Sequence, residues 1–133
     1  IGMQDQDLSL PRPVMAVLEL GKELEPLPMP EGEASFRGYV GSVAIDASGT
    51  YVVATSPRTS TAGLWSLAAR RWIGALHLPD VCGLTAGAAP GAFWATSGHG
   101  DVFALNATAT GLTQKQRWHT DTGFDNHVLR LSA

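Results

Sequence analysis

Short apolar runs with a period of two, separated by polar turn residues, follow one another along most of the chain. Val43 and Ile45 alternate with smaller residues, and the run 51–55 that follows is rich in aromatic and β-branched residues. Between these runs, Asp46 and Gly49 stand at the entrance and the end of a short turn. These residue types favour tight turns at those positions. The pattern therefore predicts a β-hairpin.

The chain contains two imperfect copies of one unit, 39–80 and 81–121. In the first copy, Tyr51-Val-Val-Ala-Thr-Ser corresponds to Phe93-Trp-Ala-Thr-Ser in the second. In the same way, Leu64-Trp-Ser-Leu corresponds to Val102-Phe-Ala-Leu. A repeat of about 40–45 residues made of strands is typical of a β-propeller blade. The repeat therefore predicts an all-β chain built from propeller blades.

About two full four-stranded antiparallel blades are expected, with a partial blade at each end. The expected parts are an extended lead-in over 1–13, a partial blade over 14–32, two blades over 39–80 and 81–121, and the first strand of a further blade over 122–133. A helix over 62–75 is the alternative, because this segment has good helix propensity. Propensity is a weak guide, however, and the repeat favours strands there. The chain is expected to be a single domain or a propeller fragment.

Charge and composition exclude several classes of protein. The net charge is −3, with seven acidic and two basic residues over 1–35, and five acidic and seven basic residues over 36–133. Neither part has the dense basic stripe of a nucleic-acid-binding surface, so nucleic acid is not expected as a partner. No apolar run is long enough to predict a membrane span. The polar N-terminus has no signal-peptide pattern, and a start without Met suggests a mature product or an excised fragment.

Blade geometry predicts where a binding site would lie. Loops that enter the innermost strand of each blade share one face, the upper rim, with loops that join the second strand to the third. Such loops on a rigid scaffold commonly carry binding residues. The candidates for ligand or partner contact on this rim are Arg37, Tyr39, Arg58, Asp80, His99, Asp101, Asp125, Asn126 and His127.

The candidate rim residues are open to several chemical roles. The arginines could clamp a carboxylate or a phosphate, and His with Asp could bind a metal ion or move a proton. The alternative is a structural role in turns, which Asp and Asn commonly take. No HxH or HExxH spacing is present, so no metal site, cofactor or catalytic residue is predicted, although a metal ion stays open.

Several other side chains are assigned structural roles. Cys82 is the only cysteine, which excludes an internal disulfide and a CxxC metal pair, and its small neighbours predict a buried, inert thiol. His77 and His119 are expected in outer strands. The tryptophans fall on predicted strands and are expected to pack between blades: Trp65, Trp72, Trp94 and Trp118.

Two resemblances follow from these motifs. Leu64-Trp-Ser-Leu with Trp72-Ile-Gly-Ala-Leu is similar to the end of a WD40-type blade, with Ser66 where the signature aspartate would stand. More of the chain, most of 12–131, resembles the DUF1513 family of exported bacterial proteins of unknown function. This resemblance is carried by five motifs: Arg37-Gly-Tyr-Val-Gly-Ser-Val-Ala-Ile-Asp, Ala54-Thr-Ser-Pro-Arg, Asp80-Val-Cys-Gly-Leu, Thr96-Ser-Gly-His-Gly and Asp125-Asn-His.

The family resemblance implies a larger protein and a location. It implies that the chain is the C-terminal part of a seven-bladed propeller that is exported to the periplasm. It also implies a link to iron acquisition, because such proteins are often encoded beside imelysin-type iron-uptake components. The resemblance supplies no catalytic residues.

Three functions are compatible with the sequence. The leading interpretation is a non-enzymatic binding or scaffold module that contacts a protein or a small-molecule ligand through the upper rim. The alternative is a metal-dependent enzyme of the hydrolase-type propellers, with its site on the same rim. A purely structural role is the third. Open strand edges are expected to pair with remaining blades or to cause self-association.

Overall fold

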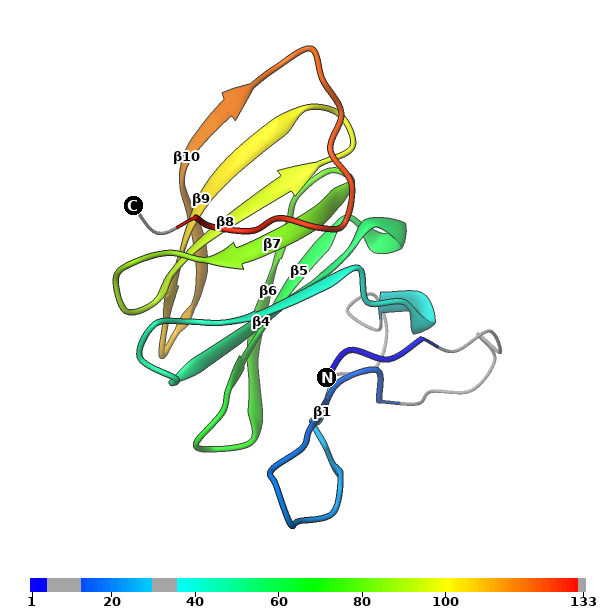
Figure 1. The fold of residues 1–133 in the computed structure, drawn as a ribbon, viewed down its shortest axis with the longest axis vertical. Helices are drawn as coiled ribbons and strands as arrows, with labels where there is room; N and C mark the ends of the chain where they lie inside the picture. The colour runs from blue at the N-terminus through cyan, green and yellow to red at the C-terminus, as the bar shows by residue number, and fades with distance from the viewer. Residues whose placement is uncertain (5–12, 30–35, 132–133) are drawn as a thin grey trace.

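Two four-stranded antiparallel sheets make up most of the chain in the computed structural model, which describes residues 1–4, 13–29 and 36–131 (Figure 1). The first sheet contains β3 (Ser42–Ile45), β4 (Tyr51–Ser56), β5 (Thr61–Ser66) and β6 (Arg71–His77). The second contains β7 (Val81–Ala86), β8 (Ala92–Ser97), β9 (Asp101–Thr108) and β10 (Gly111–His119). Each strand pairs with its neighbour in sequence. The all-β prediction is confirmed, and β5 and β6 occupy the segment for which a helix was the alternative.

The two sheets pack face to face through alternate residues of their strands. In β9, Phe103, Leu105 and Ala107 are buried while the residues between them are only half-buried. These residues meet Val53 and Leu64 of the first sheet in one apolar core. Alternation places one set of side chains on each face of a strand. In β9 the period of two therefore separates the buried face from the other face, whereas β4 and β5 are buried along most of their length.

The other face of the first sheet carries a second apolar core. Trp65 is fully buried there and contacts Phe36 and Trp72 edge-to-face, with ring centroids 5.9 Å and 4.7 Å away. Its indole Nε1 donates a hydrogen bond to the carbonyl of Pro28, at 2.7 Å. Buried tryptophans usually satisfy their N–H in this way. Trp65 thus attaches the N-terminal segment to the first sheet.

The tryptophans of the second sheet are in a different environment. The ring centroids of Trp94 in β8 and Trp118 in β10 lie 5.5 Å apart. Trp94 is 38% exposed and Trp118 is 43% exposed. By alternation along β8, they lie on the face opposite the core that contains Phe93 and Ala95. Packing of this exposed face against a further blade stays a prediction.

The ends of the chain are less regular than the sequence predicts. In the expected partial blade, the described residues form only two two-residue strands, β1 (Ala16–Val17) and β2 (Glu25–Pro26). The expected lead-in forms single bridges from Gly2 to Met15 and from Gln4 to Tyr39. Parts of both expectations, over 5–12 and 30–32, lie outside the described residues.

The further strand expected over 122–133 is not formed in its described part, 122–131. His127 makes one isolated parallel bridge to Leu84 in β7 instead. Continuous pairing needs a second strand from the same blade, and no described strand lies on the outer side of this segment. The segment still runs beside β7, as Figure 1 shows for the red end of the chain.

A buried carboxylate ties the two sheets together at one end. Asp46, in the turn between β3 and β4, accepts hydrogen bonds from the backbone N–H groups of Thr50 and Tyr51 at 2.9 Å and 2.8 Å. It also accepts one at 2.9 Å from the N–H of Gly91, which belongs to the second sheet's β7–β8 turn. Burial by itself raises the pKa of this carboxyl, but the hydrogen bonds from Ser48, Tyr51 and Gly91 outweigh burial and lower its pKa to about 2.

Replacement of Asp46 by Asn is expected to destabilise the chain by about 2 kcal/mol at neutral pH, because the folded carboxylate is favoured by that order of free energy. The pKa is depressed on folding, so this contribution is present above 3.8, the ordinary pKa of an aspartate, and is lost as the pH falls towards 2. Urea unfolding of both proteins at several pH values measures it. The exposed Asp121→Asn variant is the control, and equal stability of the two variants would contradict the assignment.

Candidate functional site

One end of the two sheets gathers loops that lie far apart in the sequence. Figure 1 shows η1 (Phe36–Gly38), η2 (Pro57–Thr59), the β6–β7 and β8–β9 connections and the segment after β10 on the same side of the molecule. These are the loops that the sequence places on the upper rim. The opposite end carries the turns around Asp46 and Gly91.

Three of these loops meet in a cluster of side chains, which we call the rim cluster: Arg37, Tyr39, Arg58 and Asn126. The Asn126 side-chain amide donates a hydrogen bond to the Tyr39 hydroxyl at 2.9 Å, across 87 residues of sequence. The Arg58 guanidinium carbon lies 4.7 Å from the centre of the Tyr39 ring, a cation–π distance. Arg58 Nη1 also donates to the Arg37 carbonyl at 3.4 Å. The contacts hold the Arg58 guanidinium in one place at the surface.

The backbone of η1 is in an unusual conformation at this cluster. Phe36, Arg37 and Gly38 have φ values of 53°, 42° and 63°, in the left-handed region. Residues other than glycine pay roughly 1–2 kcal/mol to adopt it. Phe36 is fully buried in the second core, and its carbonyl accepts a hydrogen bond from the Ser56 hydroxyl at 3.1 Å. These contacts hold the strained turn, which leaves Arg37 exposed at its tip.

Asp80 and His99 form a second pair on the rim. His99 Nε2 lies 3.8 Å from Asp80 Oδ2, between the β6–β7 and β8–β9 connections. A Cβ on Gly98 would lie 2.3 Å from the same oxygen, so only glycine allows this approach. The described residues give no hydrogen bond or ion pair between this pair and the rim cluster.

Asp125 and His127 flank Asn126 and are both exposed. The Asp125 carboxylate accepts a hydrogen bond from the backbone N–H of Asn126 at 2.7 Å. This contact is of the turn-forming kind that Asp commonly makes. Ligand or partner contact by these rim residues stays a prediction.

Asp101 does not lie on the open rim, contrary to its predicted position. Only 2% of it is exposed. Its carboxylate accepts from Arg117 Nε at 2.9 Å and lies 3.1 Å from His119 Nδ1, and Ser97 Oγ donates to it at 3.3 Å. Burial raises the pKa of this carboxyl, but the hydrogen bonds from Arg117, His119 and Ser97 lower it more. Asp101 therefore fixes the end of the β9–β10 hairpin.

Cys82 is buried, as the sequence predicts. Its sulfur lies 3.4–3.5 Å from the carbonyl oxygens of Phe124, Asp125 and Thr96. Burial raises the pKa of the Cys82 thiol. A neutral, enclosed thiol is a poor nucleophile, so this side chain supports the segment after β10 rather than presenting reactive sulfur to solvent.

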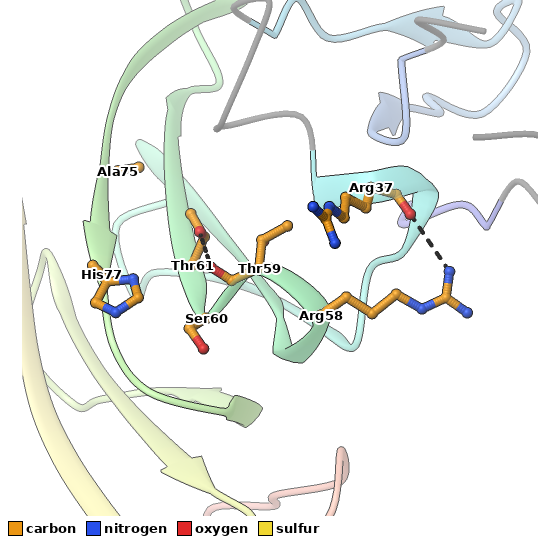
Figure 2. A pocket seen from close by; sticks show the side chains of 7 residues that line it. All are labelled: Arg37, Arg58, Thr59, Ser60, Thr61, Ala75 and His77. Atoms are coloured by element: carbon orange, nitrogen blue, oxygen red, sulfur yellow. Dashed lines mark hydrogen bonds between the residues drawn. The ribbon is translucent and has the colours of Figure 1, made fainter. Parts of the chain in front are cut away.

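A groove lies beside the rim cluster, between the two short 3-10 helices and strands β5 and β6 of the first sheet. Its volume is about 640 Å³, and it is lined by Arg37, Arg58, Thr59, Ser60, Thr61, Ala75 and His77. Figure 2 shows the Arg37 guanidinium on the side of η1 that faces Thr59 and Thr61, whereas Arg58 extends the other way, towards the Arg37 carbonyl. The sequence indicates the two arginines but misses the other lining residues, although the run Arg-Thr-Ser-Thr is a local signal of hydroxyl groups beside a cation.

Within residues 1–4, 13–29 and 36–131, no three His, Cys, Asp or Glu side chains come together closely enough to hold a metal ion. In the same part of the chain, no helix has the length and apolar character needed to cross a membrane.

The sequence matches one known protein family over nearly its whole length. Residues 1–131 match the family described as protein of unknown function DUF1513. The chain belongs to the DUF1513 family. The match covers the rim cluster, both sheets and the described N-terminal segments. A search of curated proteins found no match to the sequence.

Solved structures similar to this DUF1513 chain include WD40-repeat and β-propeller domains. The WD40 repeats of RRP9 share 18% identity with a TM-score of 0.60, over 76% of this chain and 29% of theirs. The β-propeller domain of Cps50 (Swd1) from Myceliophteria thermophila shares 11% identity with a TM-score of 0.59, over 77% of this chain and 36% of its own. Hydrazine synthase of Kuenenia stuttgartiensis is also similar, with 6% identity, a TM-score of 0.57, and coverage of 66% of this chain and 26% of the enzyme.

These similarities confirm the predicted all-β propeller fold. At sequence identities this low, they bear on the fold alone. The two sheets are propeller blades, and the WD40-like resemblance of the blade is also confirmed. The DUF1513 chain spans about a quarter to a third of the length of the structures that it resembles. A ring of seven blades stays a prediction.

Replacement of Asp101 by Asn in this DUF1513 chain is expected to lower the free energy of unfolding by about 1–3 kcal/mol, because the buried hydrogen-bond network loses its negative charge and one of its two acceptor oxygens. Urea unfolding followed by circular dichroism measures the loss. The exposed Asp121→Asn variant should change stability by less than about 0.5 kcal/mol. Equal stability of wild type and Asp101→Asn would contradict the structural role assigned to Asp101.

Proposed function

We propose that this chain is a non-enzymatic binding and scaffold module of an exported bacterial β-propeller, and that its rim cluster contacts the partner. The observation that carries this proposal is the convergence of Tyr39, Arg58 and Asn126, which come from three separate loops. Loops that converge on a rigid scaffold are the usual origin of binding surfaces. The strained backbone at Arg37 supports the proposal, because such strain is concentrated at functional sites.

The chemistry of the cluster favours an acidic partner. Stacking on Tyr39 orients the Arg58 guanidinium before binding, which reduces the entropy lost when a partner is contacted. A guanidinium offers planar, paired donors that match a carboxylate. Among the described residues, no carboxylate forms an ion pair with Arg37 or Arg58. The proposed partner is therefore a protein or small molecule that presents carboxylates to the rim.

A short fluorescent polyglutamate peptide tests this proposal as a simple acidic partner. Binding to the full chain, measured by fluorescence anisotropy, is expected to weaken roughly threefold to tenfold in Arg58→Ala. It should also weaken with added salt, because exposed charges are screened. Tyr39→Phe keeps the ring under Arg58 but loses the Asn126 contact, so a smaller loss is expected.

The control for this experiment is Arg71→Ala, which removes the same charge from an exposed position on β6. Specific recognition predicts that this variant binds the peptide like wild type. If Arg71→Ala and Arg58→Ala weaken binding equally, or if neither does, the rim cluster is not the contact surface.

We also propose that the whole protein acts in the periplasm in connection with iron acquisition, as its family resemblance suggests. A strain that lacks the full-length gene should grow more slowly under iron limitation, and wild type but not Arg58→Ala should restore growth. The Arg71→Ala variant is again the control. Normal growth of the deletion strain under iron limitation, or recovery of the protein in the cytoplasmic fraction, would contradict this proposal.

A further inference from the structure

The groove beside the rim cluster has a cation that no described side chain neutralises. Arg37 is exposed, and its guanidinium lies on the side of η1 that faces Thr59 and Thr61 (Figure 2). Asp80, in the neighbouring β6–β7 connection, directs a carboxylate oxygen towards Gly98 and His99. Among the described residues that line the groove, Arg37 and Arg58 carry fixed charges, both positive, and Thr59, Ser60 and Thr61 line it beside them.

One of these hydroxyl groups has no partner. Thr59 Oγ1 is buried and makes no hydrogen bond with any described residue. It is the only such side-chain atom among the described residues. A buried polar group without a partner costs free energy, and an unmet ligand is one of its physical explanations.

The hydroxyls beside Thr59 are partly engaged. Thr61 Oγ1 donates to the Thr59 carbonyl at 2.9 Å, and Ser60 Oγ accepts from the backbone N–H of Asp80 at 3.0 Å. The Ser60 oxygen acts only as an acceptor in that contact, so its own proton can be donated to a ligand. Ser60 is held in the left-handed region, with φ of 51°, at the end of η2.

Thr59 can offer its hydroxyl to the groove by rotation of its side chain. A rotation of about 120° about χ1 can bring the hydroxyl to the position that the methyl group occupies, while the methyl group moves to the position of the Cβ hydrogen. In free protein the hydroxyl has no hydrogen bond to lose in this rotation. A ligand with several acceptor oxygens would then receive donors from Arg37, Thr59 and Ser60.

We propose that this groove binds a phosphate group, either of free phosphate or of a small phosphate ester. A guanidinium provides paired N–H donors to phosphate, and the hydroxyls of Thr59 and Ser60 supply further donors to the remaining oxygens. A phosphate spreads its oxygens tetrahedrally and carries more charge than a carboxylate, so it can meet donors that approach from different directions. The phosphate site is tested at Arg37 and Thr59, whereas the acidic-partner contact is tested at Arg58 and Tyr39 of the rim cluster.

The test uses the full chain and inorganic phosphate at constant ionic strength, with binding followed by NMR chemical shifts. Arg37→Ala is expected to weaken phosphate binding roughly tenfold or more, because a charge-assisted bidentate contact is lost. Thr59→Val keeps the shape but removes the hydroxyl, and should weaken binding roughly threefold to tenfold. Thr59→Ser retains the hydroxyl and is expected to bind like wild type. Arg71→Ala is the matched charge control.

A second readout separates ligand contact from a structural role of Thr59. Without ligand, Thr59→Val should melt about 2–5 °C higher than wild type, because an unsatisfied buried hydroxyl is removed. A residue that only supports the fold would lower both stability and binding. The proposal thus predicts opposite changes in stability and in phosphate affinity from one substitution.

Binding of glycerol phosphate, a phosphate ester, and of succinate, a dicarboxylate, is then compared with binding of inorganic phosphate. Tighter binding of glycerol phosphate than of phosphate indicates an ester as the natural ligand, and the reverse indicates free phosphate. Tighter binding of succinate would overturn the phosphate assignment. So would saturable phosphate binding that is the same in wild type, Arg37→Ala and Thr59→Val, or no saturable binding at all. These outcomes leave the peptide experiment on Arg58 unaffected, so the two proposals fail separately.

Discussion

The apolar packing between the two sheets is the interaction on which the rest of the structure depends. Phe93 and Phe103 of the second sheet are buried against Val53 and Leu64 of the first. Burial of each large side chain contributes on the order of 1.5–3 kcal/mol. Because side chains alternate along a strand, a slip of one residue would expose this whole set. The packing therefore fixes the register of the strands, and with it the residues at which each loop begins and ends.

Polar contacts at both ends then specify how the blades and loops are placed. At one end, Asp46 of the first sheet accepts the Gly91 N–H of the second. Near the rim, the Thr55 hydroxyl donates to the Cys82 carbonyl, and Asn126 donates to Tyr39. Buried polar groups are costly unless their partners are in place. These contacts therefore favour one relative position of the blades, and this position assembles the rim cluster.

Local pattern was enough to predict the blades and much of the rim. The alternation around Val43 and Ile45 specifies a strand, and a blade repeat then puts Arg58 and Asn126 in loops on one face. Asp101 is expected on the rim because it directly follows the loop 97–100 at the start of a strand, but in the structure its side chain is buried. Its contacts to Arg117 and His119 depend on the register of β9 with β10, which includes a bulge between Gln114 and Gln116. No sequence pattern predicts that register.

The groove could not be predicted for a related reason. A missing hydrogen-bond partner, as at Thr59, is a property of all the surrounding atoms and not of any short segment. The strand expected after residue 121 fails similarly, because apolar residues such as Val128 form a strand only where another strand pairs with them. What the sequence does specify is which loops share a face, and the chemistry of the site follows from their packing.

Blade packing joins two loops 87 residues apart in the sequence through the contact of Tyr39 with Asn126. A double-mutant cycle with Tyr39→Phe, Asn126→Ala and the double variant, measured by urea unfolding, tests this contact directly. The structure predicts a coupling free energy of about 0.5–1.5 kcal/mol, typical of one partly buried hydrogen bond. Additive effects, with coupling below about 0.3 kcal/mol, would contradict the assembly of the rim.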